Sequence, residues 1–193
     1  MSYQPREIPM SNKILYGSAI LFACIIVLSN YLVGFRILDT HITYGALSYP
    51  FSFLIMDILS EKFNRKDVMR ALRIGLLLTF LPSLFIATTP TIAIASVSAF
   101  FISQFLDVVV FYRLKQKYPS FWWLRNGVSA GIAQLVDTFI FFHVAFFFTM
   151  PYYDVFMLFI SDYGIKLLVN LLDIPVFYLI AIKTYKKFQF FSK

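Results

Sequence analysis

The chain has 193 residues and a formal net charge of +7; 60% of its residues are hydrophobic and only 14% are charged. A soluble domain of this length has too little interior to bury so much apolar surface. The low charge and the 24 phenylalanines also exclude a disordered chain. The composition therefore predicts an integral membrane protein.

Six apolar stretches are long enough to cross a bilayer, so we expect an all-α, polytopic six-helix bundle forming one domain over residues 1–193. The predicted spans are, in chain order, 14–33, 42–59, 72–89, 91–112, 127–148 and 156–182. The first span is uncharged over twenty residues, which suits a permanent helix better than a cleavable signal. Pro50, Pro82 and Pro175 lie within or near the spans, where each can kink a helix.

The distribution of basic residues predicts the topology. Of the seventeen Lys and Arg residues, fifteen flank the spans on one side, Arg36 alone flanks them on the other, and Lys166 lies within a span. The positive-inside rule then places both termini and the two basic loops in the cytoplasm. The charge therefore reports topology, and we expect no nucleic-acid partner.

Two Gln-x-x-Asp pairs interrupt these apolar stretches: Gln104 with Asp107, and Gln134 with Asp137. Residues three apart share one face of a helix, so each pair presents an amide and a carboxyl together. A carboxylate in hydrocarbon costs ~3 kcal/mol or more, so it should face the bundle interior or a water-filled cavity. The pairs are the leading site candidates, and their recurrence fits either a small inverted repeat or a shared helical pattern.

Other polar groups also lie at membrane depth. Five carboxyls fall within or at the edge of the spans, against the single ammonium of Lys166; they are Asp57, Asp107, Asp137, Asp162 and Asp173. A dry interior could not hold all of them ionised, so some are protonated, some touch water, or a ligand brings donors. Alternatively, Lys166 pairs with Asp162 or Asp137 as a structural bridge. Glu61 is expected to be solvated, and His41 to lie at an external edge.

The sequence lacks the usual marks of an enzyme or a metalloprotein. Two isolated histidines and one cysteine offer no metal-ligand spacing, and there is no Walker-type glycine loop. Cys24 has no internal disulfide partner and is expected to be small buried filler. We expect no cofactor and no catalytic residue, while a membrane-embedded enzyme or scaffold stays open as a minor alternative.

Six short segments between about residues 29 and 180, taken together in their order and spacing, carry a family resemblance. They are Ser29–Val33, Tyr44–Phe51 leading to Asp57, Ile102–Phe111, Val136–Thr138, Asp162–Tyr163 followed by Lys166, and Pro175. In their order and spacing, the chain resembles the YhhQ-type queuosine-precursor transporters, also called the VUT family. The likeness covers most of the chain.

This resemblance implies a multi-pass protein of the bacterial inner membrane that imports 7-deazaguanine precursors of queuosine. The expected substrates are 7-cyano-7-deazaguanine (preQ0), 7-aminomethyl-7-deazaguanine (preQ1), or both. A different arrangement also fits a small six-helix protein, namely the substrate-binding subunit of an energy-coupling-factor-type vitamin importer. The partners expected are this small molecule and the lipid bilayer; a homo-oligomer and the energy source stay open.

A deazaguanine suits the predicted polar groups. One carboxylate can accept the adjacent N–H donors of its pairing edge, and an amide N–H₂ can meet its carbonyl. We expect Asp107 or Asp137 to bind the pairing edge of the deazaguanine and Gln104 to bind its carbonyl, and we rank Gln134 and Glu61 lower. The predicted substrate-binding set is Gln104, Asp107, Asp137, Lys166, Asn30, Asp57, Tyr44 and Phe111. The candidates for proton coupling are Asp137, Asp162 and Asp107.

Overall fold

The computed structural model of the chain describes residues 8–35, 37, 43–86 and 90–183. Its elements are α1 (Asn12–Leu32), α2 (Tyr44–Ser48), α3 (Pro50–Lys62), α4 (Arg65–Ile86), α5 (Pro90–Lys117), α6 (Trp122–Phe146), α7 (Tyr152–Phe177) and the π-helix η1 (Tyr178–Lys183). An isolated parallel β-bridge joins Ile8 and Phe63. The all-α prediction is confirmed, while Arg36 and His41 lie outside the described residues.

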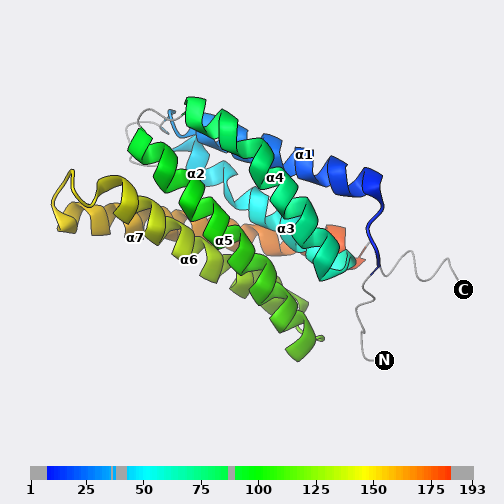
Figure 1. Cartoon of the computed structure of the whole chain (residues 1–193). Coiled ribbons are helices and arrows are strands. Elements are labelled where there is room, and N and C mark those ends of the chain that lie inside the picture. The colour runs from blue at the N-terminus through cyan, green and yellow to red at the C-terminus, as the bar shows by residue number, and fades with distance from the viewer. Residues whose placement is uncertain (1–7, 36, 38–42, 87–89, 184–193) are drawn as a thin grey trace, which may run out of the picture.

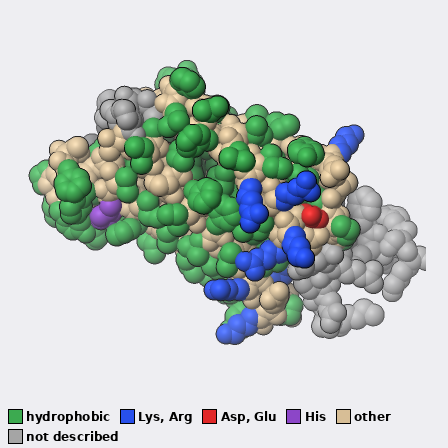
Figure 2. Space-filling view, viewed as in Figure 1, with side chains coloured by type: hydrophobic (Ala, Val, Ile, Leu, Met, Phe, Trp, Pro, Cys, Tyr) green, Lys and Arg blue, Asp and Glu red, His purple; other side chains and the backbone are tan. Residues whose placement is uncertain are grey.

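Among the described residues, five helices are long and apolar enough to cross a membrane: α1, α4, α5, α6, and α7 continued by η1. Large apolar side chains cover much of the surface (Figure 2), as shown by Leu77 and Phe148, which are 76% and 95% exposed. An apolar exterior around buried polar groups is the arrangement that a bilayer favours. The chain is therefore a multi-pass membrane protein. Cys24 is exposed on α1, so the expectation of a buried filler was wrong.

The long helices form a curved row with α3 inside it (Figure 1). Along this row α1 packs on α4, α4 on α5, α5 on α6 and α6 on α7, while α3 contacts α1, α4, α5, α6 and α7. Nine of the thirteen residues of α3 are buried, including Asp57 and Glu61. Because α3 is central, its polar side chains can reach partners on several helices.

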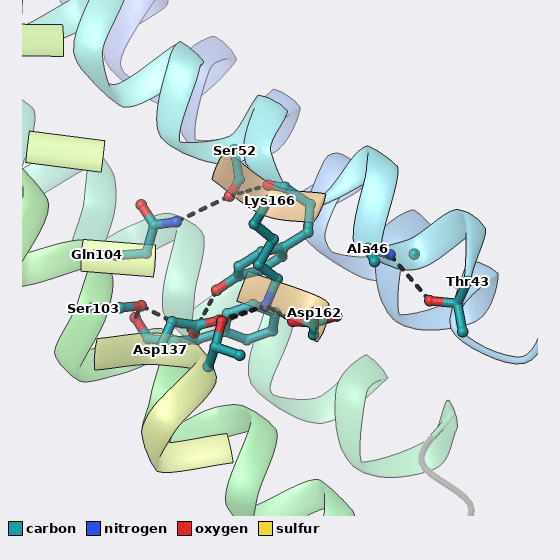
Figure 3. A network of polar contacts seen from close by, with 12 residues as sticks. Thr43, Ala46, Ser52, Ser103, Gln104, Asp137, Asp162 and Lys166 are labelled. Atoms are coloured by element: carbon teal, nitrogen blue, oxygen red, sulfur yellow. Dashed lines mark hydrogen bonds and ion pairs between the residues drawn. The ribbon is translucent and has the colours of Figure 1, made fainter. Parts of the chain in front are cut away.

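The predicted span 42–59 is a broken helix. Its first piece, α2, begins after Thr43, whose Oγ1 accepts a hydrogen bond from the Ala46 backbone N–H at 3.1 Å (Figure 3). The second piece begins at Pro50, which lacks an N–H to continue the hydrogen bonds of α2 but fits a first helical turn. At 1.5 Å per residue, α2 and α3 together extend ~28 Å. That length is close to the ~30 Å hydrocarbon core of a bilayer.

Three helices extend further into the basic segments than predicted. The fourth helix begins at Arg65 instead of 72, α5 ends at Lys117 instead of 112, and α6 begins at Trp122 instead of 127. Lys and Arg are good helix formers whose long stems can cover apolar surface, so the helices continue beyond the hydrophobic runs. Pro82 lies inside α4 without ending it.

Hydrogen bonds tie four helix ends together at one end of the bundle, which we call the basic end. There the Ile8 carbonyl accepts a hydrogen bond from the Asn64 N–H at 3.1 Å, and the Met10 N–H donates to Asp67 at 2.8 Å. The Tyr112 hydroxyl donates to the Phe63 carbonyl at 2.6 Å. These bonds join the start of α1, the end of α3, the start of α4 and the end of α5. Lys and Arg side chains gather at this end (Figure 2).

Gly45 lets α2 lie directly against α1. A Cβ at this position would stand 2.7 Å from the Ser29 carbonyl oxygen and 2.8 Å from the Val33 nitrogen, both of which are backbone atoms. We therefore expect Gly45→Ala to destabilise the fold by about 1–3 kcal/mol. The measurement is the unfolding temperature in detergent, which should be lower for Gly45→Ala than for the wild type. Gly17→Ala is the matched control, because no atom lies within 4 Å of its added Cβ; an equal loss in both variants would contradict the close contact.

Candidate functional site

Asp137 is the hub of the buried polar contacts. This α6 carboxylate is 3% exposed. One of its oxygens, Oδ1, accepts hydrogen bonds from the Tyr49 hydroxyl at 2.7 Å and the Ser103 hydroxyl at 3.2 Å. The other, Oδ2, accepts one from the Lys166 ammonium at 3.2 Å. The carboxylate therefore ties together α6, α5, α7 and the α2–α3 junction (Figure 3).

Lys166 on α7 lies between two carboxylates. Its ammonium is 2.8 Å from Asp162 Oδ2 and 3.2 Å from Asp137 Oδ2, and it also donates to Thr138 Oγ1 at 3.1 Å. The structure thus contains both pairings that the sequence left as alternatives. We call Asp137, Asp162 and Lys166 the charge cluster. The Asp162 side chain is 20% exposed, against 5% for Asp137, so Asp162 is the more accessible acid.

Tyr49 was missed by the sequence analysis, although it lies within the resembling segment Tyr44–Phe51. Its ring stacks on Phe100 with centroids 4.7 Å apart and meets the edge of Phe53 at 5.5 Å. The Lys166 ammonium lies 4.8 Å from the ring centroid. The ring is therefore fixed on several sides, and its hydroxyl is held against Asp137.

Gln104 is only partly satisfied. Its Nε2 donates to the Ser52 hydroxyl of α3 at 3.0 Å (Figure 3). Its Oε1 is buried and accepts no hydrogen bond from the part of the chain that the structure describes. Since an amide N–H₂ carries two donors, Gln104 keeps one N–H and one carbonyl oxygen for a further partner.

Asp57 and Asp107 form a second acidic site, which we call the acid pair. Asp57 accepts hydrogen bonds from Asn126 Nδ2 at 2.6 Å and from the Ser129 hydroxyl at 3.4 Å. Asp107 lies close to Asp57 and Ser129, yet both of its buried oxygens accept no hydrogen bond from the described residues. The Oδ1 of Asn126 is buried without a donor as well.

Gln134 lies at the level of Asp107. Because α5 and α6 are antiparallel and Ser103 meets Asp137, one turn toward the basic end leads from Ser103 to Asp107 and from Asp137 to Gln134. The Gln134 side chain is fully buried, and neither its nitrogen nor its oxygen has a hydrogen-bond partner among the described residues. The acid of each Gln-x-x-Asp pair thus stands level with the amide of the other.

An ion pair closes the basic end, where Glu61 was expected to be solvated. Instead Glu61 is 3% exposed, and its two oxygens accept from Nε and Nη2 of Arg125, each at 2.7 Å. The Lys115 ammonium donates to the carbonyls of Ser60 and Glu61 at 2.7 and 3.0 Å. We call Glu61, Lys115 and Arg125 the basic-end clamp. Lys115 lies on α5 and Arg125 on α6, and both point into the bundle, whereas the sequence analysis placed them in a basic loop.

Three predicted residues lie away from these contacts. Phe111, one turn beyond Asp107, is fully buried against Phe177 with ring centroids 6.1 Å apart. Asn30 donates to the Ser83 hydroxyl at 2.8 Å and so joins α1 to α4. Tyr44 is 48% exposed at the start of α2. Their roles in substrate binding stay predictions.

Four residues with buried polar atoms that have no hydrogen-bond partner among the described residues lie between the charge cluster and the basic-end clamp: Gln104, Asp107, Asn126 and Gln134. Ser60 and His143 each carry one such atom as well. Most buried polar atoms in proteins have a partner, so a group of unpaired ones marks a place for a polar ligand or water. Among the described residues, no grouping of three or more His, Cys, Asp or Glu side chains could hold a metal ion. The fold and these contacts define a polytopic membrane protein with a cluster of buried polar groups, the candidate site, inside its helix bundle.

Comparisons with known proteins give the family. A family model described as "Putative vitamin uptake transporter" matches residues 83–180, which include all of α5, α6 and α7. The "Probable queuosine precursor transporter" of Bacillus subtilis is 37% identical over 161 residues, covering 70% of each chain. The "Queuosine precursor transporter" of Escherichia coli is 33% identical over 158 residues, covering 69% of each.

The chain belongs to this family of queuosine precursor transporters, as the resemblance predicted. A relative from Haemophilus influenzae with the name "Probable queuosine precursor transporter" is 30% identical over 126 residues, covering 55% of this chain and 53% of its own. No solved structure matches the chain.

Within the basic-end clamp, the stability of the fold should depend on Glu61 and Arg125 being present together. We expect Arg125→Met to destabilise the protein by about 3–5 kcal/mol, because it leaves the Glu61 carboxylate buried without its cation. Thermal unfolding in detergent measures the loss. The double variant Glu61→Met/Arg125→Met should recover part of it, since removing Glu61 as well takes away the buried carboxylate that Arg125 neutralises. If the double variant is as unstable as the single one, the lost stability comes from packing and not from an unpaired charge.

Proposed function

We propose that this protein takes up the queuosine precursors preQ0, preQ1 or both across the bacterial inner membrane, binding them between the charge cluster and the basic-end clamp. The observation that carries the proposal is the set of buried, unpaired groups on Gln104, Asp107, Asn126 and Gln134. A guanine-like base has both donors and acceptors on its edges, so it can satisfy carboxylate and amide groups together. The names of the relatives support the same class of substrate.

Asp107 is the better candidate for the pairing edge of the base. The oxygens of Asp137 already accept from Tyr49, Ser103 and Lys166. Both oxygens of Asp107 are unpaired, so they can accept two adjacent N–H donors from one ligand. The remaining N–H of Gln104, one turn away, can then donate to the ligand carbonyl.

The bundle crosses the membrane six times in this proposal. Besides the five long helices, the sixth crossing is the broken α2–α3 unit, whose length of ~28 Å suits a bilayer core. The basic end is then cytoplasmic and carries both termini, following the positive-inside rule. The basic-end clamp would block the cytoplasmic route, and the partly exposed Asp162 lies on the route from the opposite end.

Proton coupling is the proposed energy source. The candidates are Asp107, Asp137 and Asp162, because carboxyls inside a bundle can exchange protons as their partners change. Asp137 and Asp162 share the Lys166 ammonium, so protonating either one would weaken an ion pair between α6 and α7 or within α7. Such a change can bias two arrangements of the helices.

Replacing the proposed ligand-binding acid should abolish high-affinity uptake. We expect Asp107→Asn to weaken binding by about 2–5 kcal/mol, more than tenfold, because the amide loses the charge and one acceptor site. The measurement is uptake of preQ0 and preQ1 by proteoliposomes that contain this chain alone. Wild-type uptake in that system also excludes a binding subunit that depends on a separate energy-coupling module.

Asp154→Asn is the matched control, because Asp154 is exposed in the first turn of α7. It should transport like the wild type. Normal transport by Asp107→Asn would show that Asp107 does not bind the substrate. A wild-type protein that binds the ligands but does not transport them would favour the binding-subunit alternative.

The proposed topology predicts which turns face the cytoplasm. In a background with Cys24 replaced by Ala, Ser120→Cys lies in the turn between α5 and α6, and Asp154→Cys lies at the opposite end. Both positions are exposed. A membrane-impermeant thiol reagent added to intact spheroplasts should label Asp154→Cys and should label Ser120→Cys only after lysis. The reverse pattern would invert the proposed orientation.

A further inference from the structure

A cavity of about 380 Å³ lies between α4 and α5, away from the acid pair. Its lining includes Arg73, Leu77, Phe80, Ser83, Phe100 and Phe101. Leu77, Phe101 and Phe80 are 76%, 55% and 44% exposed, so the cavity opens on the outer, membrane-facing side of these two helices. We call it the α4–α5 groove; the two helices lie side by side in Figure 1.

A single charged residue, Arg73, lies at the basic end of the groove. It is exposed, and its guanidinium forms no hydrogen bond or ion pair with any described residue. The clamp residue Arg125, by contrast, is fully buried and bound to Glu61. An unpaired guanidinium near the lipid headgroups is suited to a phosphate, which it can bind through two parallel N–H donors.

The length of the groove fits one lipid chain. Along α4 its lining runs from Arg73 to Ser83, which is ~15 Å at 1.5 Å per residue. One leaflet contributes about half of the ~30 Å hydrocarbon core, so an acyl chain starting near Arg73 would end near Ser83. The groove therefore has a charged end at the headgroup level and apolar walls along the depth of one leaflet.

We propose that the α4–α5 groove binds one anionic phospholipid from the leaflet at the basic end. Its phosphate pairs with Arg73, and one acyl chain lies along Leu77, Phe80 and Phe101. A second copy of this chain is a poorer occupant, because neighbouring copies share one orientation in the membrane. Two such grooves would bring the like charges of Arg73 and Arg70 together in the same leaflet.

The lipid would touch the wall of the charge cluster. Phe100 lines the groove and is only 6% exposed, and its ring stacks on Tyr49, which holds Asp137. Filling the groove supports this aromatic pair from the lipid side. The inference does not depend on which molecule the protein transports, so it stands or fails separately from the proposed function.

The test is native mass spectrometry of the full chain, released from detergent micelles supplemented with phosphatidylglycerol or with phosphatidylcholine. The wild type should retain one phosphatidylglycerol and several-fold less phosphatidylcholine. Arg73→Gln should lose this preference. Arg113→Gln is the matched control, because Arg113 is exposed at the basic end of α5 and does not line the groove; it should retain phosphatidylglycerol like the wild type.

A second variant tests the acyl chain. Val97→Trp places a large ring in the groove without changing charge and should also lower retention several-fold, whereas glycerol 3-phosphate alone should not bind the wild type. Unfolding temperatures in lipid-free detergent verify that each variant folds. Equal retention by wild type, Arg73→Gln and Val97→Trp would overturn the proposal. Binding of glycerol 3-phosphate alone, or a dimer peak that Val97→Trp removes, would also overturn it.

Discussion

The bilayer gives no water to a buried charge, so the bundle must supply the partners itself, and the Lys166–Asp137 contact is where partners come together from four elements of the fold. One ammonium meets Asp137 at 3.2 Å and Asp162 at 2.8 Å, while Tyr49 and Ser103 complete the Asp137 carboxylate. These bonds fix α5, α6, α7 and the α2–α3 junction relative to one another. The geometry of the whole polar interior follows from this contact.

The acid pair contrasts with that arrangement. About one turn away toward the basic end, Asp107 is equally buried, but its oxygens accept no hydrogen bond from the described residues, and Gln134 at the same level has no partner among them either. A bundle built only for stability gains nothing from such groups, because each unpaired one costs free energy. The proposed substrate would give these groups their partners when it binds, which accounts for both their burial and their lack of partners.

The broken α2–α3 unit brings these two regions together. Tyr49 at the break contacts Asp137 of the charge cluster. Further along α3, Ser52 contacts Gln104, and Asp57 forms the acid pair with Asp107. The close approach at Gly45 holds the short α2 against α1. A helix interrupted near a binding site is a recurrent feature of secondary transporters, because freed backbone groups and a change of direction both become available there.

The sequence by itself determined the membrane class, the all-helical fold, the approximate spans and the family, since these follow from long apolar runs and from the ordered motifs around Gln104 and Asp107. It could not decide which acid is paired. Asp107 and Asp137 sit in almost identical Gln-x-x-Asp contexts, and only the packing of α3 and α7 brings Lys166 to one and leaves the other without a cation. Likewise, the sequence around Glu61 is typical of a surface residue with basic neighbours. Glu61 is buried because Lys115 of α5 and Arg125 of α6 contact it from inside the bundle. These residues are far from Glu61 in sequence, so a local sequence pattern does not reveal the contacts.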